Sequence, residues 1–166
     1  MQKTELPEMV SEGVITLTVN GETHSLFIQA SWTLAYVLRE KLGLTGTKEF
    51  CGEGACGACA VIIDERPILS CMTLAIECDG KSVETVEGIA RVNHPLIKAY
   101  AKHHCMQCGF CTPGFVVTAK ALLDRNPDPS DGEIRQALAG NLCRCGTYPQ
   151  HVMAVREAAE TLRGGK

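Results

Sequence analysis

Ten cysteines among 166 residues constrain what this chain can fold into more than any other feature of its sequence. Residues 1–13 contain neither the basic segment nor the apolar segment of an export signal, so we expect the protein to stay in the cytoplasm. Disulfides are rare in that compartment, and cysteines that cluster there usually bind metal. The sequence therefore predicts metal sites.

The first set of cysteines is Cys51, Cys56, Cys59 and Cys71, which gives C-x4-C-x2-C and a fourth cysteine after a longer gap. This is the spacing of plant-type [2Fe–2S] ligands. The three glycines inside the loop allow sharp bends and can turn backbone N–H groups toward the sulfurs. We predict that these four cysteines bind a [2Fe–2S] cluster.

Two other interpretations of this loop are weaker. Four cysteines suffice for zinc, but structural zinc sites usually combine two C-x2-C pairs. Gly52, Gly54 and Gly57 also satisfy the G-x-G-x-x-G fingerprint of dinucleotide-binding proteins. That fingerprint follows a strand and opens a helix, whereas this loop contains cysteines and precedes a predicted strand. We therefore reject dinucleotide binding here.

The second set of cysteines is Cys108 and Cys111, which form C-x2-C, with Cys143 and Cys145, which form C-x-C. Each pair precedes a predicted helix, and helix N-termini carry positive partial charge that suits an anionic cluster. The spacing alone admits both [2Fe–2S] and zinc. Cys105 adds the opening of a [4Fe–4S] motif, but the fourth cysteine of that motif is missing.

The remaining cysteines, Cys78 and Cys105, are predicted to be small buried apolar side chains. The five histidines have no C-x-H partner of the Rieske type, so we expect them to have no ligand role.

The first half of the chain shows strand and hairpin patterns. Asn20-Gly21 separates two strand-like runs at 14–19 and 22–28, which predicts a hairpin. A helix is predicted over 34–42 and further strands over 60–64, 68–71 and 82–86, with a turn at 65–67. These elements predict a small α+β domain with a mixed sheet at residues 1–88.

The second half, residues 89–166, has helical patterns throughout. Asn93 is a predicted helix cap, Thr112 begins a second helix that Asn126 ends, and Ser130 with Glu133 forms a capping box for a third. Apolar residues at helical spacing predict a fourth helix over 152–162. We predict an all-α four-helix domain.

Charge and hydropathy exclude some classes of partner. The net charge of −3 carries no basic excess for binding nucleic acid. No run of about 18 apolar residues is present, so we predict no segment inserted in a membrane.

The chain resembles the small iron–sulfur subunit of molybdenum hydroxylases, the family of xanthine dehydrogenase and aldehyde oxidase. The matching stretches are Gly43–Lys48, Cys51–Cys59, Gln107–Gly114 and Gly140–Cys145, within a similarity that runs from about 14 to 162. The resemblance implies a β-grasp ferredoxin-like domain followed by a four-helix domain, with a [2Fe–2S] cluster in each. Residues 1–12 would be an N-terminal extension.

The resemblance also implies an electron-transfer role without catalytic residues in this chain. A large partner subunit would carry molybdopterin and oxidise the substrate, and an FAD-binding subunit or another acceptor would receive the electrons. Gln107 would hydrogen-bond the pterin, and Cys145, an iron ligand, would lie against the pterin amino group. Many relatives have C-R-C-T-G-Y, whereas residues 143–148 of this chain are C-R-C-G-T-Y. A minority of relatives share this second order, and some of those lack the flavin subunit.

Two other functions remain open at the level of sequence. The chain could be a free-standing two-cluster ferredoxin that shuttles between partners, although such a protein has no need of the second domain. It could also be a zinc-stabilised interaction module, although such a module would not need the plant-type loop.

Overall fold

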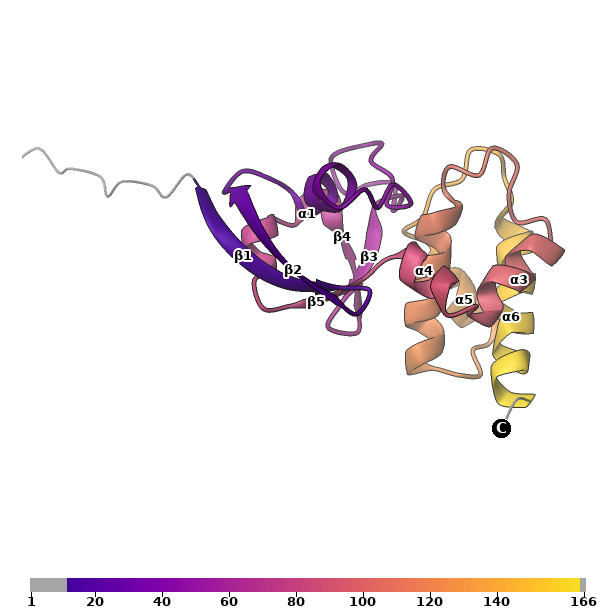
Figure 1. Ribbon diagram of the computed structural model, residues 1–166. Coiled ribbons are helices and arrows are strands. Elements are labelled where there is room, and N and C mark those ends of the chain that lie inside the picture. The colour runs from indigo at the N-terminus through magenta and orange to yellow at the C-terminus, as the bar shows by residue number, and fades with distance from the viewer. Residues whose placement is uncertain (1–11, 165–166) are drawn as a thin grey trace, which may run out of the picture.

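The computed structural model describes residues 12–164, in which a sheet-containing part lies beside a bundle of helices (Figure 1). The strands are β1 (Glu12–Val19), β2 (Glu22–Gln29), β3 (Ala60–Ile63), β4 (Arg66–Leu69) and β5 (Ser82–Glu84). The α-helices are α1 (Leu34–Tyr36), α2 (Val86–Arg91), α3 (Pro95–Lys102), α4 (Thr112–Arg125), α5 (Asp131–Leu138) and α6 (Tyr148–Gly164). Apart from Glu12, the predicted extension at 1–12 lies outside the described residues.

The five strands form one mixed sheet in the order β2-β1-β5-β3-β4. β1 and β2 are the predicted hairpin, and Asn20 and Gly21 at its turn have φ of 51° and 85°. Positive φ at both positions is what the favoured two-residue hairpin turn requires. β5 pairs parallel to β1 and antiparallel to β3. The predicted α+β class with a mixed sheet is confirmed.

The second hairpin turns earlier than predicted. The predicted turn at 65–67 is wrong, because the turn residues are Asp64 and Glu65, with φ of 47° and 68°. Arg66 begins β4, and Pro67 pairs with Ile62 of β3. A proline is tolerated there because β4 is an edge strand, where the missing N–H faces away from the sheet.

Strand β3 joins the two halves of the molecule because both of its faces are buried. Val61 and Ile63 belong to the core between the sheet and α1, whereas Ala60 and Ile62 belong to the core of the helical part. Side chains of successive strand residues point to opposite faces, so one short strand serves both cores.

The four predicted helices of the second half are present as α3, α4, α5 and α6. The capping box of Ser130 and Glu133 forms as predicted at the start of α5. The predicted cap of α3 is wrong by one residue, since His94 accepts from the Leu96 N–H while Asn93 has φ of 50°. Helix α2 was not predicted, and it runs across the predicted boundary at residue 88.

None of the helices between residues 12 and 164 combines the length and the apolarity that crossing a membrane requires.

Candidate metal centres

The first set of cysteines lies on the loop before β3 and on the segment after β4. Cys56, Cys59 and Cys71 are buried and Cys51 is half-buried. The Cys59 and Cys71 sulfurs lie 3.3 Å apart. Ser70 holds them together, because its hydroxyl and its N–H both donate to the Cys59 carbonyl, at 2.7 and 3.3 Å.

The glycines of this loop have the backbone conformation that the sequence predicts. Gly52, Gly54 and Gly57 all have positive φ, between 65° and 78°. N–H groups of the loop, first that of Glu53, and the Cys56 thiol donate to the Cys51 sulfur and lower its pKa to about 7. The loop therefore presents donors to sulfur, as an anionic cluster requires.

The second set of cysteines gathers where the loops before α4 and α6 meet. The Cys108 and Cys145 sulfurs lie 3.6 Å apart, and the Cys111 and Cys143 sulfurs lie within 4.8 Å of each other. Cys111 is the N-cap of α4, and the Cys143–Cys145 loop leads into α6. The predicted meeting of two helix-start loops is confirmed.

Thiol pKa values differ strongly within this second set. Burial acts to raise the pKa of Cys143, but hydrogen bonds, chiefly from the Thr147 hydroxyl and N–H, lower it to about 7. Burial raises the pKa of Cys111 to about 12. Cys111 therefore needs a metal to lose its proton, whereas Cys143 is already close to ionisation at neutral pH.

The spacing of the sulfurs separates a two-metal cluster from a single ion. Four thiolates bound at about 2.3 Å to one tetrahedral zinc lie about 3.8 Å from one another. Between residues 12 and 164, the only three metal-binding side chains whose ligand atoms all lie within 4.8 Å of one another are Cys111, Cys143 and His151. In neither set do the four sulfurs lie close enough together to bind one ion. Two pairs of thiolates, one pair for each of two irons, fit these positions.

The two sets of cysteines face each other across the junction of the two halves. The Leu142 N–H donates to the Cys56 carbonyl at 2.9 Å, and the Asn141 side chain donates to the Gly57 carbonyl at 3.0 Å. Leu142 directly precedes Cys143. One backbone hydrogen bond thus connects a cysteine of the first set to the neighbour of a cysteine of the second.

A cavity of about 540 Å³ lies between the two sets. Cys56 lines it from one side and Cys108, Cys111 and Cys143 from the other. The rest of its lining is mainly apolar, with Phe50, Ala58, Phe110, Leu142, Arg144 and Tyr148. Four of these side chains, Phe50, Phe110, Leu142 and Tyr148, are exposed, so the cavity opens to the surface. Its apolar lining lowers the polarity around the sulfur ligands, which affects the reduction potential of a cluster.

Comparisons with known proteins agree with this geometry. A family described as "2Fe-2S iron-sulfur cluster binding domain" matches residues 17–77, and one described as "[2Fe-2S] binding domain" matches residues 85–156. The nicotinate dehydrogenase small FeS subunit of Eubacterium barkeri is 47% identical over 148 residues, which cover 88% of this chain and 94% of that protein. The chain belongs to the small iron–sulfur subunits of the molybdenum hydroxylases.

Solved structures of the family have the same fold as this subunit. Quinoline 2-oxidoreductase from Pseudomonas putida 86 matches with a TM-score of 0.88 and 42% identity over 93% of this chain and 98% of that one. Aldehyde oxidoreductase from Desulfovibrio gigas matches with a TM-score of 0.87 and 44% identity over 92% of this chain but 17% of its own. The subunit is an iron–sulfur electron-transfer component of an oxidoreductase, and its cofactors are [2Fe–2S] clusters.

The other residues singled out in the sequence divide into two groups. Gln107 is exposed and its side-chain amide donates to the Cys145 carbonyl at 3.5 Å, so the two proposed pterin contacts lie side by side. Cys78 and Cys105 are fully buried, as predicted, and burial raises the pKa of their thiols to about 11 and 12.

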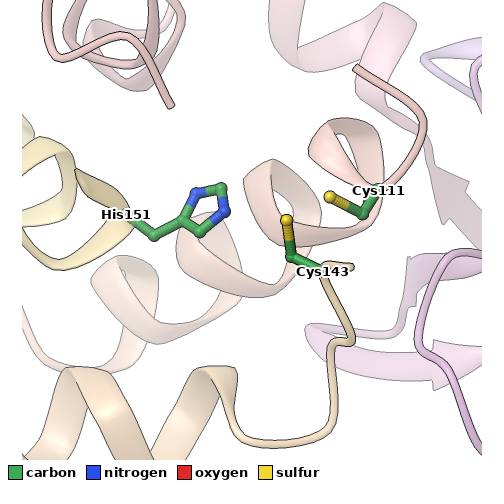
Figure 2. Close-up of side chains that lie close together, drawn as sticks. All are labelled: Cys111, Cys143 and His151. Atoms are coloured by element: carbon green, nitrogen blue, oxygen red, sulfur yellow. The ribbon is translucent and has the colours of Figure 1, made fainter. Parts of the chain in front are cut away.

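One histidine near the second set was not predicted to belong to the site. His151 is fully buried, and its ring points toward Cys111 and Cys143 (Figure 2). Thr147, four residues earlier, lies between His151 and Cys143 within hydrogen-bond distance of both. The only signal in the sequence was this i, i+4 spacing at the start of the last helix, which places the two side chains on one face.

Proposed function

We propose that the subunit carries single electrons from a molybdopterin site on a large partner subunit to a flavin subunit or another acceptor. In this proposal Cys51, Cys56, Cys59 and Cys71 hold one [2Fe–2S] cluster, and Cys108, Cys111, Cys143 and Cys145 hold the other. Bound at these positions, the clusters take up and release one electron each. The domain boundary near residue 88 and the cytoplasmic location belong to the same proposal.

The observation that carries the proposal is the contact between the two sets of cysteines. The Leu142 N–H to Cys56 carbonyl bond, at 2.9 Å, joins the two proposed ligand loops through protein atoms. This contact brings the two proposed ligand loops together, as electron transfer between two clusters requires. The buried Asn141 amide, 3.0 Å from the Gly57 carbonyl, fixes the same junction.

The exposed surface beside the second set supports its position next to the partner. Gln107 and Cys145 lie together at this surface. Both residues are proposed to contact the pterin. Large exposed apolar side chains are present here: Met106 precedes Gln107 in the chain, and Phe110, Leu142 and Tyr148 line the cavity with Cys108. An exposed apolar patch of this kind is typical of a protein interface.

The order in which the clusters become reduced tests the proposal. The complex should be purified from its host, mixed rapidly with substrate and frozen at intervals for electron paramagnetic resonance. We expect a molybdenum subunit to co-purify and the second cluster to accept electrons before the first. Purification without any molybdenum subunit would favour the free-standing ferredoxin, and earlier reduction of the first cluster would contradict the proposed direction.

A further inference from the structure

His151 lies in a buried setting that leaves it one N–H to donate. Its ring stacks on Phe115, with centroids 3.9 Å apart and planes within 8°, and the ring of Tyr100 packs 5.4 Å away. His151 is fully buried, and burial disfavours the charged imidazolium, so the neutral ring carries a single proton on one of its two nitrogens.

Thr147 connects this histidine to a proposed iron ligand. Its hydroxyl oxygen lies 3.1 Å from His151 Nε2 and 3.2 Å from Cys143 Sγ, and the residue is buried. A thiolate that binds iron has no proton, so the hydroxyl must donate to Cys143. Because a hydroxyl has one hydrogen, Thr147 then accepts its second bond from the N–H of His151.

The other ring nitrogen agrees with this assignment of the proton. His151 Nδ1 is buried and has no hydrogen-bond partner among the described residues. A buried lone pair without a partner costs less than a buried N–H without one, so the proton belongs on Nε2. The hydrogen bonds then run in one direction, from His151 through Thr147 to Cys143.

We propose that Thr147 and His151 form a relay of hydrogen bonds that ends on Cys143 and raises the reduction potential of the second cluster. The inference rests on the proposed role of Cys143 as an iron ligand. Reduction makes a cluster more negative, and hydrogen bonds donated to its sulfurs stabilise that charge. Thr147 acts on the ligand directly, whereas His151 is a positioning residue that fixes the direction of the Thr147 hydroxyl.

A competing role for His151 is direct binding of metal. Its nitrogen and the sulfurs of Cys111 and Cys143 lie within 4.8 Å of one another (Figure 2). In the relay Nε2 carries the proton, so this nitrogen donates to Thr147 and does not bind a metal. The two roles therefore predict different outcomes when the histidine is replaced.

The first part of the test replaces Thr147 in the complete cluster-loaded protein and measures both midpoint potentials by redox titration. Thr147→Val removes the hydroxyl and keeps the shape, so the second cluster should take up its electron about tenfold less favourably, a fall of about 59 mV. The first cluster should not change. Thr147→Ser keeps the hydroxyl and should retain the potential, and Thr161→Val makes the same change at an exposed position of α6.

The second part of the test replaces His151 alone and together with Thr147. His151→Phe keeps a ring for stacking on Phe115, and we expect a smaller fall in the same potential. The double variant should fall no further than Thr147→Val, because His151 acts only through Thr147. An unchanged potential in Thr147→Val, or additive shifts in the double variant, would overturn the relay.

Three further outcomes would decide between the proposed roles. Loss of iron from the second site in His151→Phe would make the histidine a ligand and overturn the relay. If Thr147→Val does not load its second cluster, an unchanged potential in loaded His151→Phe overturns the proposal by itself. The Cys143→Ala variant separates this inference from the proposed function. If this variant kept the electron paramagnetic resonance signal of the second cluster, Cys143 would not be an iron ligand.

Discussion

Individual cysteine side chains differ in how easily they give up their protons. Burial raises the pKa of Cys59 to about 11 and that of Cys111 to about 12, whereas hydrogen bonds hold those of Cys51 and Cys143 near 7. Each set thus combines a thiol that ionises readily with one that needs the metal. Binding of the cluster must therefore supply free energy for ionisation, which couples metal content to folding.

Replacing one proposed ligand should remove one cluster and spare the other. We expect Cys56→Ala to abolish one of the two paramagnetic signals of the reduced protein, because a [2Fe–2S] cluster requires four ligands. The other signal should persist, because its proposed ligands all lie between residues 108 and 145. Electron paramagnetic resonance with iron analysis makes the measurement.

The matched control for this replacement is Cys78→Ala. Cys78 is also fully buried but is not a proposed ligand, so both signals should remain. Loss of both signals from folded Cys56→Ala protein would contradict the division of the cysteines into two sets.

Gln107 should affect delivery of electrons without affecting the clusters. Gln107→Ala removes a proposed hydrogen bond to the pterin, at a cost of about 1–3 kcal/mol if the pterin group stays unpaired. We expect slower reduction of both clusters by substrate, or weaker retention of molybdenum. Reduction by dithionite should be unchanged, because Gln107 does not bind iron. Stopped-flow absorbance measures both rates.

An exposed glutamine away from the proposed interface provides the control for Gln107. Gln136 on α5 is also exposed, and Gln136→Ala should leave reduction by substrate at the wild-type rate. A Gln107→Ala complex with full molybdenum content and wild-type reduction by substrate would refute the proposed contact.

At the scale of elements, the sequence predicted best where one residue type decides the local geometry. Asn20-Gly21 predicts its hairpin because positive φ at both positions suits this pair. The turn at Asp64 and Glu65 was misplaced because the nearby Pro67 is a strong turn signal that here occupies an edge strand. Local signals do not reveal which strand will lie at an edge, since pairing with distant strands decides it.

The packing of α4 against the first cysteine loop explains the glycine at position 114. A Cβ atom there would lie 2.4 Å from the Gly57 carbonyl oxygen, a backbone atom of the loop. We expect Gly114→Ala to lower the free energy of unfolding by about 1–3 kcal/mol through overpacking. Denaturant unfolding measures the stability. Transfer between the clusters should also slow, since the two loops must move apart.

Gly132 in α5 is the control for this change. A Cβ atom there meets only the Ser130 hydroxyl oxygen, at 3.9 Å, so Gly132→Ala should be neutral or stabilise by up to about 1 kcal/mol. Equal stabilities of Gly114→Ala and Gly132→Ala would show that the junction between the halves tolerates an added methyl group.

For the whole molecule, the spacing of the cysteines along the chain predicts which residues form the site. It does not predict how those residues are arranged in space. The plant-type loop and the two later cysteine pairs could be predicted, because ligand spacing is a property of the sequence. The hydrogen bond from Leu142 to Cys56 and the positions of Thr147 and His151 beside Cys143 could not be predicted. They depend on β3 being shared by two cores, which brings together loops far apart in the chain.

The complete protein should contain about four irons and about four labile sulfides, because two [2Fe–2S] clusters with four cysteines each account for eight of its ten cysteines. Cys78 and Cys105 are fully buried, so a thiol reagent should modify almost nothing in the native protein. After denaturation and release of the clusters it should modify all ten cysteines. Metal analysis, sulfide analysis and thiol titration of one preparation make the measurement. Zinc at either site would refute that cluster, about six irons would indicate a [4Fe–4S] centre, and thiols reactive in the loaded native protein would show that a proposed ligand is free.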